Sequence, residues 1–402
     1  MAGSSSTAAQ QDRQLLLQPS RLGRLALANR LVVAPMTRVS ATEQGVPTAR
    51  MSDYYRRFAE GGFGLVITEG LYTDRRSSQG YLFQPGLANA AQLDGWRKIV
   101  ANVHDGGGRI IAQLMHAGAL SQGSAHSDRN LGPSVVRPKG QQMAFYRGKG
   151  EYPVPEAMTL QDISNAIAGF AEAAVRAREA GFDGVEIHGA NGYLLDQFLT
   201  EGSNLRSDIH GASLAGRLRL INEVVAAVRD ATGPGFAVGL RISQAKVNDF
   251  THKWSRGEQE AAEIFTTLGT LPLDYLHTTE YDAWTPAFSK GPSLAALAKK
   301  YAALAVLANG SLHDQHRAAG MVRRDEADAV ALGRGAIMHA DWPRRLADGR
   351  PLNAFDPGLL SPLADLENAE RFQAEQGLGQ GQWAAPAQWQ GQPGFKCRDG
   401  FS

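Results

Sequence analysis

The most constraining feature of the sequence is an alternation of short apolar runs with longer amphipathic segments, repeated eight times. The short runs are continuously apolar, which indicates strands buried on both faces. The expected strands are LVVAPM (31–36), LVITEG (65–70), RIIAQLMH (109–116), GVEIHG (184–189), FAVGLRIS (236–243), LDYLHTT (273–279), AVLANG (305–310) and ADAVALGRG (327–335). Eight such units predict an α/β fold, a single closed (β/α)8 TIM barrel. An open doubly wound sheet is the alternative, but eight near-equal units favour closure.

The segments between the strands carry apolar residues at helical spacing, which supports this interpretation. The first long helix is expected to begin at Asp162, a candidate N-cap, and to stop at Gly181. The second is expected between Ser213 and Gly233. The helices predicted in this way are 162–181, 213–233, 257–269 and 293–302.

Two segments interrupt the repeat. Residues 117–158 contain Gly, Ser, Pro and scattered aromatics without a helical period, and an excursion this long is expected to cap the barrel mouth. The end of the chain is rich in Trp, Gly, Pro and Gln, so it is either a disordered tail or a segment that docks through Trp383 and Trp389. The expected organisation is a flexible segment 1–20, the barrel 21–365 and a tail 366–402.

The charge balance excludes some classes of partner. Lys and Arg number 41 against 40 Asp and Glu, without a basic or acidic block, so we expect neither a nucleic acid nor a membrane as partner. The single Cys397 excludes an intrachain disulfide framework, and the start of the chain does not resemble a secretory signal. These features predict a cytoplasmic protein.

Catalytic groups of a barrel lie where strands end and βα loops begin. The last two strands end in Asn309-Gly310 and Gly333-Arg334-Gly335, at the corner where barrels frequently bind a phosphate. Gln113 and Arg241 would project donors and one positive charge from two other strand ends. Gln113 and Arg241 suit a flat heterocycle that has carbonyl and imide edges and becomes anionic on reduction. Together these features predict a site for flavin mononucleotide, FMN, which would supply the difficult chemistry.

Other catalytic classes lack their residues. The strand ends carry no paired carboxylates, and the sequence contains no G-x-S-x-G motif. The histidines show no HExxH motif and no cluster with convincing spacing, so no metal site is expected.

Several segments in order along 20–360 resemble the Old Yellow Enzyme family of FMN-dependent ene-reductases. The segment GFDGVEIHGANGYLLDQFL (181–199) is the most specific of them. The others are LANRLVVAPMTR (27–38), ITEG (67–70), GYLFQPGL (80–87), AQLMHAG (112–118), GLRIS (239–243), LANG (307–310) and ALGRGAIMHADWPRRL (331–346).

The resemblance implies a cofactor site. Thr37 would hydrogen-bond the flavin carbonyl near its reactive nitrogen, Gln113 would bind the pyrimidine edge, and Arg241 would face the edge that gains charge. The residues expected to bind FMN are Pro35, Met36, Thr37, Gly70, Gln113, Arg241, Asn309, Gly310, Gly333 and Arg334.

The resemblance also implies the reaction. His188 and Asn191 would donate to the carbonyl oxygen of an α,β-unsaturated carbonyl substrate, or of a related nitroalkene. Hydride would pass from the reduced FMN to the β-carbon, and Tyr193 would protonate the α-carbon. NADPH or NADH would reduce the flavin in the same pocket, in a monomer or homodimer. Met115 stands where some relatives have a Trp, which leaves the preferred substrate size open.

Three alternatives differ in their requirements. Dienoyl-CoA reductases and amine dehydrogenases on a similar barrel carry an iron–sulfur Cys cluster, which this chain lacks. A phosphate-sugar isomerase or aldolase would need a Lys or carboxylate base at a strand end. The strand ends assigned to the cofactor, at Gln113, Arg241, Asn309-Gly310 and Gly333-Arg334-Gly335, provide none. A barrel that stores or senses flavin without catalysis stays open on sequence alone.

Overall fold

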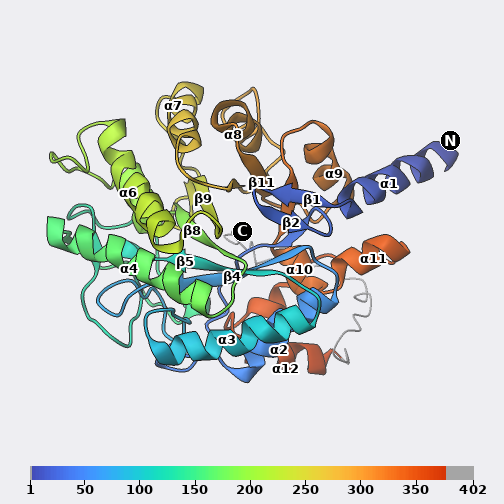
Figure 1. Ribbon diagram of the computed structural model, residues 1–402, viewed down its shortest axis with the longest axis horizontal. Helices are drawn as coiled ribbons and strands as arrows, with labels where there is room; N and C mark the ends of the chain where they lie inside the picture. The colour runs from blue at the N-terminus through green and yellow to red at the C-terminus, as the bar shows by residue number, and fades with distance from the viewer. Residues whose placement is uncertain (1, 377–402) are drawn as a thin grey trace.

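The computed structural model of the protein describes residues 2–376. Its centre is a closed barrel of eight parallel strands, visited in sequence order, with the last strand paired to the first (Figure 1). All eight predicted strands and the predicted closure are confirmed. The barrel strands are β3 (Leu31–Val33), β4 (Leu65–Tyr72), β5 (Ile110–Met115), β8 (Gly184–Asn191), β9 (Ala237–Lys246), β10 (Tyr275–Thr279), β11 (Ala305–Asn309) and β12 (Ala329–Leu332).

Helices surround the barrel (Figure 1). Their apolar sides cover its outer face. The longer ones are α2 (Ala49–Glu60), α3 (Ala90–Asp105), α4 (Leu160–Glu179), α6 (Leu214–Thr232), α7 (Glu258–Gly269), α8 (Leu294–Ala302) and α9 (Gln315–Arg323). Short helices α5 (Leu194–Leu199), α10 (Arg334–Met338) and α11 (Trp342–Asp348) follow strand ends or one another. Both faces of each barrel strand are therefore buried, as the continuous apolar runs indicated.

Local capping chemistry sets the helix limits. Helix α6 lies between its N-cap Ser213, whose Oγ accepts the Gly216 N–H, and Gly233 at its C-terminus, as predicted. The prediction that Asp162 caps α4 is wrong. Thr159 is the N-cap, and Asp162 occupies the third helical position, where its carboxylate accepts the Thr159 backbone N–H at 3.0 Å. This reciprocal pair is a capping box, which satisfies two helix-end donors at once.

The N-terminal segment, expected to be flexible over 1–20, is instead a helix, α1 (Ala2–Leu17), followed by the β1 (Ser20–Leu22) and β2 (Leu25–Leu27) hairpin. Leu16 is fully buried. Asp12 is buried and accepts from Arg323 and, at 2.5 Å, from His316 Nδ1, both on α9. These long-range contacts, which sequence periodicity does not reveal, fix α1 against the barrel.

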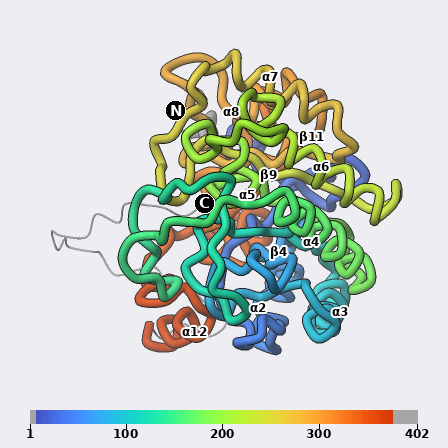
Figure 2. Tube along the Cα trace, turned by 90° about the vertical axis from the view of Figure 1, so that its left-hand side faces the viewer, coloured from blue at the N-terminus to red at the C-terminus, as the bar shows by residue number. Residues whose placement is uncertain are grey.

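The excursion 117–158 contains only short elements: η1 (Gly118–Leu120), β6 (Leu131–Gly132), η2 (Ala144–Tyr146) and β7 (Glu156–Ala157). Figure 2 shows it as teal and green loops rather than long helices. Strands β6 and β7 pair with each other and not with the barrel.

The body of the protein extends past the predicted boundary at 365. Residues η3 (Pro357–Leu360) and α12 (Leu366–Glu375) are ordered elements, and Leu366 and Ala369 are buried. Arg38 Nε donates to the Ala364 carbonyl at 2.9 Å, which ties this segment to the loop that follows the first barrel strand. Trp383 and Trp389 lie outside the described residues. Among those described, no helix is both long and apolar enough to cross a membrane.

Candidate active site

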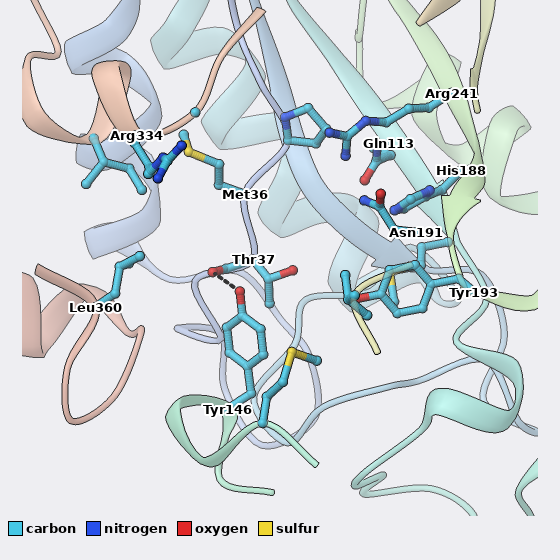
Figure 3. Close-up of a pocket in the computed structure, with 16 residues that line it drawn as sticks. Met36, Thr37, Gln113, Tyr146, His188, Asn191, Tyr193, Arg241, Arg334 and Leu360 are labelled. Carbon is cyan, nitrogen blue, oxygen red and sulfur yellow. Dashed lines mark hydrogen bonds between the residues drawn. The ribbon is translucent and has the colours of Figure 1, made fainter. Parts of the chain in front are cut away.

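A pocket of about 700 Å³ lies at the carboxyl ends of the barrel strands (Figure 3). Ten of the residues predicted from the sequence line it: Pro35, Met36, Thr37, Gln113, His188, Asn191, Tyr193, Arg241, Gly333 and Arg334. In Figure 3, His188, Asn191 and Tyr193 stand on one side of the pocket, and Met36 and Arg334 on the other. Residues as far apart in sequence as Pro35 and Arg334 therefore share one cavity.

A break in the sheet aims the residues at the end of β8 into this pocket. The pairing of β8 with β9 is regular up to Gly189 and shifts before Asn191. Asn191 is in the left-handed region, with φ of 62°, a conformation that Asn tolerates better than most residues. Its backbone N–H donates to Ser243 Oγ at 2.8 Å, and the next N–H, from Gly192, donates to Asp196 Oδ2 at 2.7 Å. The bulge thus places the Asn191 amide beside His188.

The protonation of His188 follows from its contacts. Burial, with the charge of Arg241 in second place, lowers the pKa of His188 well below its ordinary value, so the ring is neutral. Its Nδ1 accepts the Ala190 backbone N–H at 3.3 Å, and a neutral imidazole that accepts at one nitrogen carries its proton on the other. His188 therefore offers Nε2–H as a donor. Asn191 can offer a second donor from its side-chain amide.

Tyr193 is buried and lies next to His188, with ring centroids 4.9 Å apart. Its hydroxyl oxygen is 2.5 Å from that of Tyr81, a fully buried residue. Burial raises the pKa of Tyr193 to about 12, so the phenol keeps its proton at neutral pH. Tyr81 belongs to the GYLFQPGL segment, but sequence reasoning gave it no role.

Arg241 provides the test of whether the pocket suits a flavin. The guanidinium is buried, and its Nη2 donates to Asn309 Oδ1 at 2.9 Å and to Thr279 Oγ1 at 3.2 Å. Its Nε has no hydrogen-bond partner, and no carboxylate forms an ion pair with it, among the described residues. Burial lowers the pKa of Arg241 to about 10, which leaves it charged at neutral pH. An unpaired buried cation at a pocket wall fits an electron-rich ring edge.

The predicted phosphate corner is a smaller cavity of about 280 Å³ that shares Gly333 and Arg334 with the main pocket and is also lined by Asn309. Arg334 Nη2 donates to Ser311 Oγ at 2.7 Å, and no carboxylate in the described chain pairs with this guanidinium. Its charge is therefore available to a phosphate.

Three predicted residues do not line the main pocket. A Cβ on Gly70 would lie 2.5 Å from Met115 Sδ, so this glycine makes room for the methionine side chain. A Cβ on Gly310, whose φ is +141°, would lie 2.2 Å from the Glu280 carbonyl oxygen, so Gly310 permits a close approach of two loops. Asn309 uses its amide to bind Arg241 and the Ala331 carbonyl.

Sequence reasoning missed several lining residues. Tyr146 and Met143 come from the 117–158 excursion, which was expected over the mouth without named residues, and the Tyr146 hydroxyl donates to the Thr37 carbonyl at 3.3 Å. The remainder are apolar: Val247, Ile337 and Leu360. Met115, already considered as a determinant of pocket size, also lines the cavity. No cluster of His, Cys, Asp or Glu suited to a metal occurs in residues 2–376.

Comparison with known proteins adds independent evidence. The model of the NADH:flavin oxidoreductase / NADH oxidase family matches residues 15–353. The "probable flavin mononucleotide-dependent alkene reductase" of Leishmania infantum is 37% identical over 362 residues, which cover 88% of this chain and 96% of the relative.

Solved structures agree. The old yellow enzyme from Trypanosoma cruzi matches with a TM-score of 0.79 at 32% identity, over 89% of this chain and 98% of that one. Morphinone reductase in complex with tetrahydroNAD matches with a TM-score of 0.77 at 30% identity, over 88% of this chain and 96% of that one. The chain belongs to the NADH:flavin oxidoreductase / NADH oxidase family, the Old Yellow Enzyme family, and is an oxidoreductase with FMN as cofactor and NAD(P)H as reductant.

Proposed function

We propose that this enzyme reduces the activated C=C bond of α,β-unsaturated carbonyl compounds, and of nitroalkenes, at the expense of NADPH or NADH. The observation that carries the proposal is the β8 terminus. It presents two neutral hydrogen-bond donors, His188 and Asn191, and one buried phenol, Tyr193, on the same wall of one pocket. Reduction of a conjugated alkene requires hydrogen-bond donors for the carbonyl oxygen and a general acid for the carbon that is protonated. This wall of the pocket offers both.

The remaining walls would hold FMN. Pro35, Met36 and Thr37 offer a surface for the ring system, Gln113 and Arg241 offer polar groups for its pyrimidine edge, and Gly333 and Arg334 lie where the phosphate would bind. Asn309 supports this arrangement through Arg241, while Gly70 and Gly310 let neighbouring segments approach. When bound and reduced, FMN would supply the hydride that the β-carbon of the substrate needs.

His188 and Asn191 would bind the substrate carbonyl oxygen. Negative charge grows on this oxygen as the alkene is reduced, and preorganised donors stabilise that charge without having to reorient. Each donor is worth roughly 2–4 kcal/mol of barrier in comparable sites. The neutral state of His188 suits this role, because its Nε2–H stays in place as a donor and is not consumed.

Tyr193 would give its proton to the α-carbon. Tyr193 lines the pocket, and the Tyr81 hydroxyl lies 2.5 Å from its own hydroxyl. A hydrogen bond from Tyr81 would stabilise the tyrosinate left after proton transfer, since bonds to an ionised acceptor are stronger than neutral ones.

The nicotinamide would enter the same pocket before the alkene and reduce the flavin there. Morphinone reductase, whose fold this chain shares, has been crystallised with tetrahydroNAD. The two reactants then bind in turn, which makes the cycle ping-pong.

Product analysis tests the proposal. The purified enzyme with NADPH and 2-cyclohexenone is expected to give cyclohexanone, with one NADPH consumed per product formed. Reduction of the carbonyl to an allylic alcohol, or NADPH oxidation without a saturated product, would contradict it.

A further inference from the structure

Glu186, on β8, is a fully buried carboxylate inside the barrel that does not itself line the pocket. Strand register places it in one row around the barrel with Gln113 on one side and Gly239 and Tyr275 on the other. The next row, two residues further along each strand, contains His188, Arg241 and His277. Because alternate residues of a strand face the same way, both rows point into the barrel interior. The row with His188 and Arg241 borders the pocket, and the row with Glu186 lies one layer deeper.

Three groups converge on this carboxylate. Gln113 Nε2 lies 2.8 Å from Glu186 Oε1, and the Tyr275 hydroxyl and His277 Nδ1 lie 3.0 and 2.9 Å from Oε2. The Tyr275 ring reaches Glu186 across the intervening strand because position 239 is glycine, where a Cβ would lie 2.1 Å from the ring. This arrangement is therefore built into the packing of three strands.

An ionised carboxylate only accepts hydrogen bonds, so each of the three partners must donate. Burial opposes the charged form, but His277 and Arg241 outweigh it and hold the pKa of Glu186 below its ordinary value. The orientation of the Gln113 amide is thereby fixed, because the reverse one would bring two acceptors together at 2.8 Å. Its NH2 group faces Glu186, and its oxygen is left for the pocket that Gln113 lines.

We propose that Glu186 is a positioning residue for the flavin, holding the Gln113 amide so that Oε1 accepts from the imide N–H of the isoalloxazine. The pyrimidine edge of a flavin offers a single N–H donor between two carbonyl acceptors, so it pairs with an acceptor of fixed direction. This inference rests on FMN binding in the pocket. The Glu186 carboxylate also sets the charge beneath the pyrimidine edge. The buried Arg241 has no ion-pair partner of its own among the described residues, so no other contact neutralises its positive charge.

A double-mutant cycle with the holoenzyme tests the positioning role. Release of FMN on dilution, followed by flavin fluorescence, gives its dissociation constant in the wild type, Glu186→Gln, Gln113→Ala and the double variant. In Glu186→Gln the new side-chain NH2 group would face groups that donate to the wild-type carboxylate. The Gln113 amide is then no longer held in one orientation. We expect about a tenfold weaker FMN affinity, the loss of one hydrogen bond. In the Gln113→Ala background the same change should have no further effect.

An equal loss in both backgrounds, or an unchanged affinity in Glu186→Gln, would overturn the positioning role. If the Gln variant does not fold, Glu186→Asp keeps the charge but shortens the side chain, and the same dependence on Gln113 is expected. The affinity of Glu186→Asp unchanged from wild type would overturn the proposal.

The reduction potential of the bound flavin tests the role of the charge. Removing a negative charge near a group that becomes anionic should shift the potential of Glu186→Gln to a more positive value, with or without Gln113. Glu223→Gln, a change on α6 remote from the pocket, should leave the potential unchanged. A wild-type potential in Glu186→Gln would overturn the charge role. Failure of the proposed function would look different, because the wild type itself would then bind no FMN or reduce no enone.

Discussion

The hydroxyl oxygens of Tyr193 and Tyr81 lie 2.5 Å apart, although 112 positions separate the two residues in sequence. Tyr193 lines the pocket and Tyr81 does not. When Tyr81 donates this hydrogen bond, the Tyr193 proton is free to point at a substrate. When Tyr193 has lost its proton, the same bond stabilises the anion. The pair thus forms an acid with a built-in support for its conjugate base.

Substitution Tyr193→Phe removes the proposed acid and leaves the aromatic ring. We expect the reaction of reduced enzyme with 2-cyclohexenone to slow by roughly 10²–10⁴-fold, the usual contribution of a general acid. Reduction of the flavin by NADPH should keep its wild-type rate, because that step needs no proton from Tyr193. Stopped-flow measurement of the two half-reactions separates these effects. Loss of FMN binding in this variant would refute the assignment.

Substitution Tyr81→Phe removes only the hydrogen bond between the Tyr81 and Tyr193 hydroxyl groups. Its effect on the alkene half-reaction should be smaller than that of Tyr193→Phe, about tenfold, which corresponds to one hydrogen bond. The NADPH half-reaction should again be unchanged. In the Tyr193→Phe background the Tyr81→Phe substitution should add nothing, since the two residues act as one unit. Additive effects in the double variant would mean that Tyr81 acts independently of Tyr193.

Binding of a phenol reports on His188 and Asn191, because a phenolate oxygen resembles the charged oxygen of the reaction. His188→Ala and Asn191→Ala should each raise the dissociation constant of p-chlorophenol roughly 10- to 100-fold, in line with hydrogen bonds to a charged acceptor. His104→Ala changes a partly exposed histidine that pairs with Asp183, and serves as the control. Titration of the flavin absorbance measures the binding. Equal affinity in the wild type and the double Ala variant would exclude these two donors.

The pH dependence of the alkene half-reaction follows from the pKa of Tyr193. The acid must be protonated to act, and burial raises its pKa to about 12 from an ordinary value near 10. The rate constant should therefore stay level from pH 8 to pH 10, where an ordinary tyrosine would already be half ionised. His188 adds no titration near neutral pH, because burial lowers its pKa well below the ordinary value. A decline centred near pH 10 that disappears in Tyr193→Phe would contradict this account.

The barrel was predictable from sequence because each strand is buried on both faces and pairs with its neighbour in the chain. The strand ends then share one rim, so His188, Asn191 and Arg241 could be placed together without coordinates. These three residues can be recognised locally, because each is a polar residue at the end of a predicted strand.

Contacts that depend on packing between distant segments were not predictable in this way. The 2.5 Å contact of Tyr81 with Tyr193 requires the path of a loop, and the helix α1 depends on Asp12 meeting α9. Glycines carry a similar ambiguity. The resemblance implies that Gly70 and Gly310 bind FMN, but the structure shows protein atoms, Met115 Sδ and the Glu280 carbonyl oxygen, next to these glycines.

The central claim is that one pocket takes electrons from NAD(P)H and gives them to an activated alkene through FMN. An anaerobic titration of the purified protein tests it most directly. The account predicts a yellow protein with a flavin spectrum, bleached by one equivalent of NADPH or NADH and restored by one equivalent of 2-cyclohexenone without oxygen. A protein that cannot bind FMN, or a bleached flavin that the enone does not reoxidise, would contradict it.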